Sequence, residues 1–515
     1  MNVWRLLEHA TRARPAALAV VDGERRLSWR EVHARAAHLA RFLREQGIEP
    51  GDRVAVLAWN GVEFLETTFA AAGAGAVLCP LNVRLAPAEL RAVLDDTQPR
   101  WLIADRELVE RATAEGYPWE GVLCIGEGAA GGGQLDYEAT LAAKAAEGAL
   151  FRPVEVEGPA TCHLYSTSGT TGEPKGVPLT HDNVCVHALC AATELELTER
   201  DVWGHIAPMF HLADAWATLA MTAVGGVHVM LRRFDARAVI ELLQREGITV
   251  TNLIPTMLAR VVHASELDGA DVSTLRAVLS GGAPIAPALV RDTLERLGCE
   301  YVQTYGMTET SPFLTLGLLT PEMRSWAPER RLEQLSKTGR PMLGVELEVI
   351  GEDGGPVARD DRTVGEIRVR GATVTPGYRN RPEANREAFA DGWLRTGDLA
   401  VVDEHGFVTI VDRSKDVILS GGETVYSAEV EKALVEHPAV LETAVFGIED
   451  QDWGEIVVAA VVFKEGCEAS VDELQRHCRE RLAGYKVPRT LRVMRDLPRT
   501  GSGKIAKRAL REEPR

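Results

Sequence analysis

Two hydrophobic patterns alternate along most of the chain. Short apolar runs rich in β-branched residues are followed by longer segments in which apolar residues recur every three or four positions. The first pattern is typical of buried strands and the second of helices that cover a sheet. Strands are predicted at residues 53–57, 76–79, 249–254 and 277–280, and helices at residues 61–71 and 86–95. Alternation of this kind predicts an α/β fold with layered, largely parallel sheets.

The pattern changes in the last third of the chain. Short strands and turns appear around residue 371, and a charged stretch without apolar residues follows at 412–416. The elements predicted here are strands at 365–370 and 406–411 before the charged stretch and, after it, a helix at 427–436, strands at 441–446 and 457–463, and a helix containing Val471 and Leu474. We place the boundary between a large N-terminal domain (1–412) and a small α+β domain (417–515) at this stretch.

The composition is that of a globular protein with more than one domain. A chain of 515 residues exceeds what one hydrophobic core usually supports. Its eight cysteines show no spacing typical of metal ligands, so we expect reduced thiols and a cytoplasmic location. The N-terminus has no signal-peptide pattern, and the longest apolar run, residues 69–81, is too short to cross a bilayer. An integral membrane segment is therefore not expected.

Residues 165–177, with the sequence YSTSGTTGEPKGV, combine glycines, hydroxyl side chains and a lysine between two apolar runs. Glycines let backbone N–H groups turn towards an anion, hydroxyl groups add donors, and the lysine adds a positive charge. The segment therefore predicts a phosphate cradle, although a polar surface loop has a similar composition. It is not a Walker A loop, because no Gly-Lys-Ser/Thr follows at the required spacing. The residues assigned to the cradle are Ser166, Thr167, Ser168, Gly169, Thr170, Thr171, Gly172 and Lys175.

Five further motifs follow the cradle in a fixed order. They are GGAP at residues 281–284, YGMTET at 305–310, WLRTGD at 393–398, DRSKD at 412–416 and PRTGSGKI at 498–505. Together with the cradle they resemble the adenylate-forming superfamily: acyl-CoA synthetases, 4-coumarate–CoA ligases, adenylation domains of peptide synthetases and beetle luciferases. The resemblance covers nearly the whole chain. It implies a large N-terminal domain with a β-barrel-like part and a small, mobile C-terminal domain.

The resemblance implies a role in ATP binding for most of these motifs. Glu309 and Thr167 would hold Mg²⁺, a cation that prefers few carboxylates plus phosphate oxygens. Tyr305 would stack on adenine, and Asp398 would accept both ribose hydroxyls. Each residue also has an ordinary structural alternative: a helix cap for Glu309, a core position for Tyr305 and a turn for Asp398. The other ATP-binding positions implied are Gly281, Gly282, Ala283, Thr304, Gly306, Met307, Thr308 and Arg413.

The C-terminal tail contains the strongest single catalytic prediction, Lys504. Residues 474–515 include 13 Lys or Arg against 4 Asp or Glu, which indicates either a basic rim for the CoA phosphates or a solvated helical face. In the family this lysine would bridge the carboxylate and the α-phosphate as a point charge. Lys415 occupies the family's hinge position, so residues 413–416 are the expected hinge.

Gly422 is the predicted position on the CoA side. A glycine there would let the pantetheine arm of CoA pass close to the backbone. Many relatives have lysine where this chain has Leu419 and Gly421. Phosphate contacts at those two positions therefore do not transfer to this chain.

The acyl pocket is predicted around His211, which in the family gates the pocket and approaches the carboxylate. A lone histidine in an apolar run is otherwise a core residue. Ala213, Gly306 and Met307 would line the pocket. Asp214 either pairs within the large domain, the outcome we favour, or lines the pocket and selects acids with a hydrogen-bond donor.

The family resemblance predicts an ATP-dependent acid–CoA ligase that forms an acyl-adenylate and then a thioester. We expect a medium- or long-chain fatty acid, with an aryl acid as the alternative. Other possibilities stay open: an enzyme that loads a carrier protein, a luciferase-like oxygenase, or a nucleotide-binding scaffold with an inactive site. The net charge of −18 argues against nucleic-acid binding. The expected partners are a small carboxylic acid, ATP and CoA, with Mg²⁺ as cofactor, and a homodimer is an open alternative to a monomer.

Overall fold

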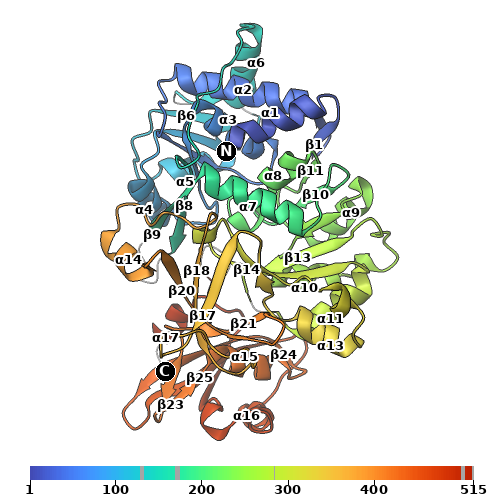
Figure 1. Cartoon of the computed structure of the whole chain (residues 1–515), viewed down its shortest axis with the longest axis vertical. Helices are drawn as coiled ribbons and strands as arrows, with labels where there is room; N and C mark the ends of the chain where they lie inside the picture. The colour runs from blue at the N-terminus through green and yellow to red at the C-terminus, as the bar shows by residue number, and fades with distance from the viewer. Residues whose placement is uncertain (128–132, 169–173, 284, 500–504, 513–515) are drawn as a thin grey trace.

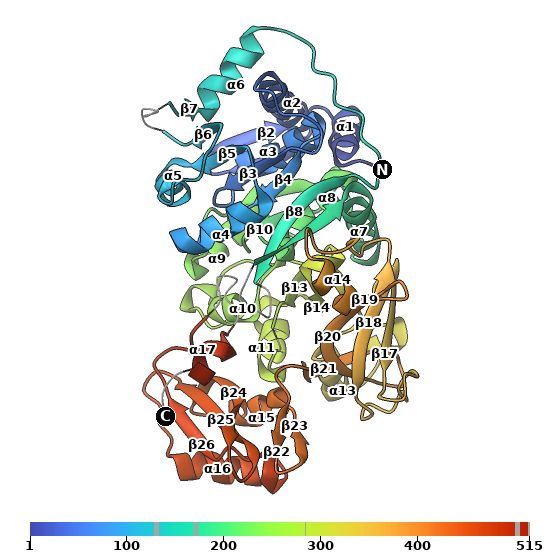
Figure 2. The ribbon, with the colours of Figure 1, turned by 90° about the vertical axis from the view of Figure 1, so that its left-hand side faces the viewer.

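The computed structural model describes residues 1–127, 133–168, 174–283, 285–499 and 505–512. The strands in these ranges form four sheets, with helices between and around them (Figure 1). The sheet built from residues 53–180 lies towards one end of the long axis, and the sheet built from residues beyond 417 lies at the other (Figure 2). The expected fold class, a large layered α/β part followed by a smaller C-terminal part, is confirmed.

The first sheet is built from residues 53–180 and includes the two strands that flank the cradle. Its strands are β3 (Arg53–Leu57), β4 (Val77–Pro80), β5 (Trp101–Asp105), β6 (Gly121–Ile125), β7 (Leu135–Asp136), β8 (Thr161–Ser168) and β9 (Pro174–Thr180). Neighbours in the order β7-β6-β5-β3-β4-β8-β9 are parallel, except that β8 and β9 form an antiparallel hairpin. The accompanying helices are α2 (Trp29–Glu45), α3 (Val62–Ala74), α4 (Pro87–Thr97), α5 (Arg106–Thr113) and α6 (Tyr137–Ala146). Every residue of α3 is buried.

The second sheet has nine strands and a parallel centre. Its strands are β1 (Leu18–Asp22), β2 (Arg25–Ser28), β10 (Val202–His205), β11 (Val227–Met230), β12 (Val250–Asn252), β13 (Ala277–Gly281), β14 (Glu300–Gly306), β15 (Phe313–Leu316) and β16 (Arg340–Pro341). They follow the order β16-β15-β14-β13-β12-β10-β11-β1-β2, and only the pairs at the two edges are antiparallel. The predicted strands at 249–254 and 277–280 are therefore neighbours, and their carboxyl ends lie at one edge, where ligands bind in such sheets.

Helices cover both faces of this second sheet. Leu279 belongs to the same apolar core as residues of α1 (Val3–Ala13), α7 (His181–Glu194) and α8 (Leu212–Val224). Its neighbour Val278 points to the other face and joins the core of α9 (Ala236–Glu246), α10 (Pro255–Val262) and α11 (Pro287–Leu297). Short elements complete this part: η1 (Ser265–Leu267), η2 (Thr308–Thr310), α12 (Pro321–Arg324) and α13 (Pro328–Leu335).

The third sheet is antiparallel. It contains β17 (Val345–Ile350), β18 (Gly365–Gly371), β19 (Phe389–Ala390), β20 (Trp393–Val402) and β21 (Val408–Arg413), with α14 (Pro382–Ala388) beside it. The order is β17-β18-β20-β19, and β21 also pairs with β20. Its own small core includes Ile367, Val369 and Leu394. This is the region in which the resemblance implies a barrel-like part.

The fourth sheet begins immediately after the charged stretch. Its elements are β22 (Ile418–Ser420), β23 (Glu423–Val425), α15 (Ser427–Val435), β24 (Val440–Asp450), β25 (Gly454–Phe463), α16 (Val471–Arg479), η3 (Gly484–Lys486), β26 (Thr490–Val493) and α17 (Lys507–Glu512). Its core contains Ile418, Val445 and Leu474. The charged stretch itself starts inside β21, which ends at Arg413, so the hinge predicted at 413–416 overlaps the end of a strand.

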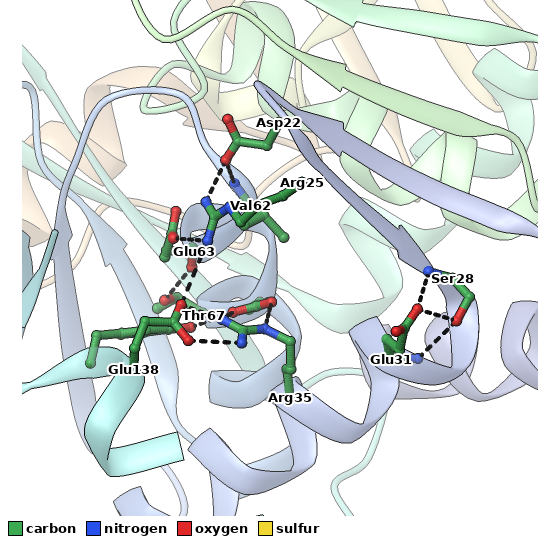
Figure 3. A network of polar contacts seen from close by, with 11 residues as sticks. Asp22, Arg25, Ser28, Glu31, Arg35, Val62, Glu63, Thr67 and Glu138 are labelled. Atoms are coloured by element: carbon green, nitrogen blue, oxygen red, sulfur yellow. Dashed lines mark hydrogen bonds and ion pairs between the residues drawn. The ribbon is translucent and has the colours of Figure 1, made fainter. Parts of the chain in front are cut away.

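A network of ion pairs joins the N-terminal hairpin β1–β2 to α2, α3 and α6 (Figure 3). Arg35 of α2 pairs with Glu66 of α3 through Nε and Oε1 at 2.5 Å, and with Glu138 of α6 at 2.6 Å. Arg25 pairs with Glu63 at 2.6 Å. Glu66 is completely buried, and burial raises its pKa to about 7. The network therefore fixes three helices around a buried carboxyl group. Among the described residues no helix is long and apolar enough to cross a membrane.

Candidate active site

The described residues of the cradle segment lie at the end of β8 and the start of β9, which pair as antiparallel strands. Thr167 pairs with Lys175 in the hairpin register, and the Thr167 hydroxyl donates to the Lys175 carbonyl oxygen at 3.4 Å. Ser166 pairs with Gly176 in the next step of the register. The Ser168 backbone ends β8. The predicted cradle residues Gly169, Thr170, Thr171 and Gly172 lie outside the described residues.

The predicted magnesium ligand Glu309 lies in η2, together with Thr308. Its side chain is 6% exposed, and its Oε1 accepts a hydrogen bond from the Tyr378 hydroxyl at 2.9 Å. The Lys175 ammonium lies over the Tyr378 ring, 5.2 Å from the ring centroid. The structure therefore links Glu309 to the cradle hairpin through a tyrosine that the sequence analysis did not identify. Within the ranges described, Glu309 has no ion-pair partner.

Tyr305 and Asp398 are in direct contact at the end of β14. The Tyr305 hydroxyl donates to Asp398 Oδ2 at 2.6 Å, and Arg413 Nε donates to Asp398 Oδ1 at 3.0 Å. Burial and the negative charge of Asp398 raise the pKa of Tyr305, so its phenol is a donor. Asp398 and Arg413 are opposite residues of β20 and β21. Because each carboxylate oxygen has two lone pairs, Asp398 can still accept hydrogen bonds from two ribose hydroxyls.

The glycines near this site serve the packing of the sheet as well as the ligand. A Cβ at Gly281 would lie 2.2 Å from Thr304 Oγ1, and one at Gly306 would lie 1.9 Å from the Pro312 carbonyl oxygen. Gly281 is therefore required by the close approach of Thr304 on the neighbouring strand. Gly282 has φ +82°, no atom of the described residues lies within 4 Å of the place of a Cβ there, and Ala283 beside it is exposed. These two residues are the ones available as a wall for a nucleotide.

His211 is the residue before the first turn of α8, at the N-cap position. It is half-buried, and its ring lies 4.7 Å from that of Phe210. Asn60 holds the preceding segment: its amide donates to the carbonyl oxygens of His205 and Ala207, and its Oδ1 accepts from the Met209 N–H. The sequence analysis missed Asn60, because nothing in its local sequence indicates a contact with a segment 145 residues away.

Two other predicted pocket residues lie on different surfaces. Ala213 is half-buried, and its carbonyl oxygen accepts from Trp216 Nε1 at 3.2 Å and from Asn252 Nδ2 at 2.9 Å. Met307 packs with Tyr305 against the core of the antiparallel sheet. Ala213 therefore lies against β12, and Met307 against the third sheet.

Asp214 points into the large domain, as we favoured. It is fully buried, and its carboxylate contacts His205 Nδ1 at 2.5 Å and Trp203 Nε1 at 3.2 Å. The chain of contacts continues from His205 Nε2 to His228 Nδ1 at 2.9 Å. Burial lowers the pKa of His228 well below its usual range. The carboxylate is thus compensated inside the protein by β10 and β11.

The predicted residues of the C-terminal part lie apart from these groups in sequence, between β21 and β22 and in the turn after β22. Lys415 is exposed, although partial desolvation of its ammonium group lowers its pKa. Its neighbour Asp416 pairs with Arg511 of α17 at 2.9 Å. Gly422 has φ +84° in the turn between β22 and β23, and within the described ranges no atom lies within 4 Å of the position of a Cβ. Lys504 lies outside the described residues.

A likeness to known proteins extends over the whole chain. A family model described as AMP-binding enzyme matches residues 7–379, and one described as AMP-binding enzyme C-terminal domain matches residues 429–504. The chain therefore belongs to the adenylate-forming superfamily, and it is an AMP-forming acid–CoA ligase.

Individual relatives differ in their acids. A long-chain-fatty-acid–CoA ligase of Thermus thermophilus is 37% identical, over 100% of this chain and 95% of the relative. A feruloyl-CoA synthase of an Amycolatopsis species is 39% identical, over 97% and 96%. The solved o-succinylbenzoate CoA synthetase of Bacillus subtilis, in complex with its acyl-adenylate, is 30% identical with a TM-score of 0.84, over 100% and 99%. The same Bacillus enzyme has also been solved with ATP and a magnesium ion.

Proposed function

We propose that this ligase activates a medium- or long-chain fatty acid with ATP and transfers it to CoA. In the first half-reaction a carboxylate oxygen attacks the α-phosphorus, and the bond to the β-phosphate breaks to release pyrophosphate. In the second, the CoA thiolate attacks the acyl carbon, and the bond from that carbon to the phosphate oxygen breaks to release AMP. Such chemistry requires mainly positioning and charge neutralisation from the protein.

The observation that supports ATP activation most directly is the environment of Glu309. Glu309 is 6% exposed as a residue, and its carboxylate accepts one hydrogen bond from a neutral phenol and has no cationic partner in the described part of the chain. A buried carboxylate is costly unless a positive charge compensates it. Glu309 and Thr167 would hold Mg²⁺, which binds one or two carboxylates together with substrate phosphates and neutralises their charge.

The contacts of the Asp214 side chain inside the protein support an aliphatic acid as the substrate. Its carboxylate is compensated by His205 and Trp203, so it does not require a polar group on the acid. The residues that flank His211, Phe210 and Leu212, are buried and apolar. Because each buried CH₂ group contributes about 0.8 kcal/mol, an apolar pocket favours longer chains until its length is filled.

One observation favours the second candidate, an aryl acid with a hydrogen-bond donor. Asn252 is 2% exposed at the carboxyl end of β12, and its Oδ1 has no hydrogen-bond partner among the described residues. Its amide holds the Ala213 carbonyl oxygen, so this acceptor lies beside a predicted pocket residue. A donor on the acid would satisfy an acceptor that is otherwise costly to leave unpaired.

A panel of acids separates the two candidates. We would measure CoA-dependent AMP formation with fatty acids of increasing length, ferulate and o-succinylbenzoate, and compare values of kcat/KM. The proposal expects kcat/KM to rise with the number of CH₂ groups to a maximum among medium or long chains. A higher kcat/KM for either aromatic acid than for every fatty acid would favour the second candidate.

The C-terminal residues complete the proposal. Lys504 would bridge the carboxylate and the α-phosphate. Backbone rotation at Lys415 would move the C-terminal domain between the arrangement for adenylate formation and the arrangement for thioester formation, in which the pantetheine arm would pass Gly422. His211 would gate the acyl pocket. A cytoplasmic location and a homodimer stay predictions.

A further inference from the structure

We propose that Tyr378 is a positioning residue for the magnesium site: its hydroxyl fixes Glu309 so that one carboxylate oxygen, Oε2, faces the metal–phosphate side. The inference rests on the proposed function, in which Glu309 binds Mg²⁺. It adds a residue from a segment, 373–381, that connects the third sheet to the cradle hairpin and that no motif above includes.

The first step of the argument is the hydrogen bond itself. The Tyr378 hydroxyl lies 2.9 Å from Glu309 Oε1, while Oε2 has no hydrogen-bond partner among the described residues. An ionised carboxylate oxygen can only accept hydrogen bonds, so the phenol is the donor in this pair. A donor on one oxygen restricts the rotation of the carboxylate and leaves the other oxygen for a metal.

The second step is the rigidity of Tyr378. Its N–H donates to Asn385 Oδ1 at 2.7 Å, and its carbonyl oxygen accepts from Asn385 Nδ2 at 2.9 Å. Its ring packs edge-on against Phe389, with centroids 6.2 Å apart. One side chain therefore holds both backbone groups of Tyr378, and the ring has a fixed neighbour. A group held in this way can position another group precisely because its own freedom is already lost.

The third step is the connection of this segment to both sides of the site. The Arg379 N–H donates to the Gly176 carbonyl oxygen in β9 at 2.9 Å, next to Lys175. On the other side, the Thr375 N–H donates to the Glu309 carbonyl oxygen at 2.8 Å. The Tyr378 ring face meets the Lys175 ammonium at 5.2 Å, a cation–π arrangement. Tyr378 therefore lies between the metal carboxylate and the cradle lysine and contacts both.

The test is Tyr378→Phe, which removes one oxygen and keeps the ring for Lys175 and Phe389. Loss of a group that orients a metal ligand typically lowers metal affinity 10- to 100-fold. We expect the Mg²⁺ concentration that gives half-maximal acid-dependent pyrophosphate exchange to rise by about this factor, with recovery of the rate at saturating Mg²⁺. A direct readout is the binding of Mn²⁺ in the presence of α,β-methylene-ATP, followed by electron paramagnetic resonance, which should weaken by a similar factor.

The matched control is Tyr117→Phe. The Tyr117 hydroxyl donates to the Pro99 carbonyl oxygen at 2.9 Å and not to Glu309, so this variant also loses one phenol hydrogen bond. We expect its Mg²⁺ and Mn²⁺ curves to match the wild type. The inference is overturned if Tyr378→Phe also matches the wild type in both curves, or if it shifts the urea midpoint while neither metal curve moves. Absence of exchange in the wild type with every acid would instead contradict the proposed function.

Discussion

Replacing Asp214 by alanine tests whether this carboxylate belongs to the scaffold or to the acyl pocket. The side chain is fully buried and contacts two ring nitrogens, Nδ1 of His205 at 2.5 Å and Nε1 of Trp203 at 3.2 Å. Its removal leaves both nitrogens without their acceptor in a place that water does not reach. We therefore expect a loss of stability rather than a change of substrate.

The size of the effect follows from the two contacts. A buried donor left unsatisfied costs about 1–3 kcal/mol, so two of them cost about 2–6 kcal/mol. Asp214→Asn keeps the shape and one acceptor oxygen, and we expect about half of that loss. Because a domain is stable by only about 5–15 kcal/mol, the alanine variant should have a clearly lower urea midpoint.

The assay combines urea unfolding with the acid panel. The matched control is Asp292→Asn, because Asp292 also pairs with a histidine, His263 at 3.0 Å, but both side chains are exposed. An exposed pair contributes about 0–1 kcal/mol, so this control should unfold like the wild type. The ratio of kcat/KM values for fatty and aromatic acids should be the same in the wild type, in Asp214→Asn and in the control.

One pattern of results would refute this reasoning. If Asp214→Asn unfolded at the urea concentration of the wild type but shifted preference towards or away from hydroxylated or aromatic acids, the carboxylate would line the pocket. The contact with His205 would then not be its main role, and the aryl-acid candidate would gain support.

Three further predictions concern other parts of the chain. Burial raises the pKa of Glu66 from its ordinary 4.5 to about 7. The free energy of unfolding should therefore fall by about 3 kcal/mol as the pH rises from 4.5 to 7, because the unfolded chain loses this proton at a lower pH than the folded protein. Glu66→Gln should remove this slope from urea midpoints measured between pH 4.5 and 7.5, and a slope of the opposite sign would show that Arg35 keeps the carboxylate ionised. Gly422→Leu should retain pyrophosphate exchange but lose thioester formation, whereas Gly422→Ala, with the same backbone strain, should retain both; equal CoA kinetics in the two variants would place the pantetheine arm elsewhere. Lys504→Ala should lose adenylate formation but keep thioester formation from supplied acyl-adenylate, and equal loss of both would indicate a structural role.

Local patterns predicted much of the fold. The strand at 53–57 and the helices at 61–71 and 86–95 were predictable because burial on a sheet imposes a periodicity that the sequence displays. The strand β17 was missed, although Val345 and Leu347 alternate with glutamates in the way that a half-buried strand requires.

The contacts of the site were harder to predict, because they join residues far apart in sequence. Glu309 meets Tyr378 across 69 residues, and Tyr305 meets Asp398 across 93. Motif residues could be assigned to a ligand, but the protein groups that orient them depend on how separate sheets pack. Gly281 shows the same limit. A side chain at this position would collide with Thr304 of the neighbouring strand, and the local sequence does not reveal that contact.

The most direct test of the central claim is a measurement of both half-reactions on one acid. The account predicts that a medium- or long-chain fatty acid supports Mg²⁺-dependent exchange of pyrophosphate into ATP without CoA, and that steady release of AMP begins only when CoA is added. Exchange that continues without any CoA-dependent turnover would indicate an enzyme that loads a different thiol. Binding of ATP without exchange for any acid would contradict the account altogether and leave a nucleotide-binding protein without this activity.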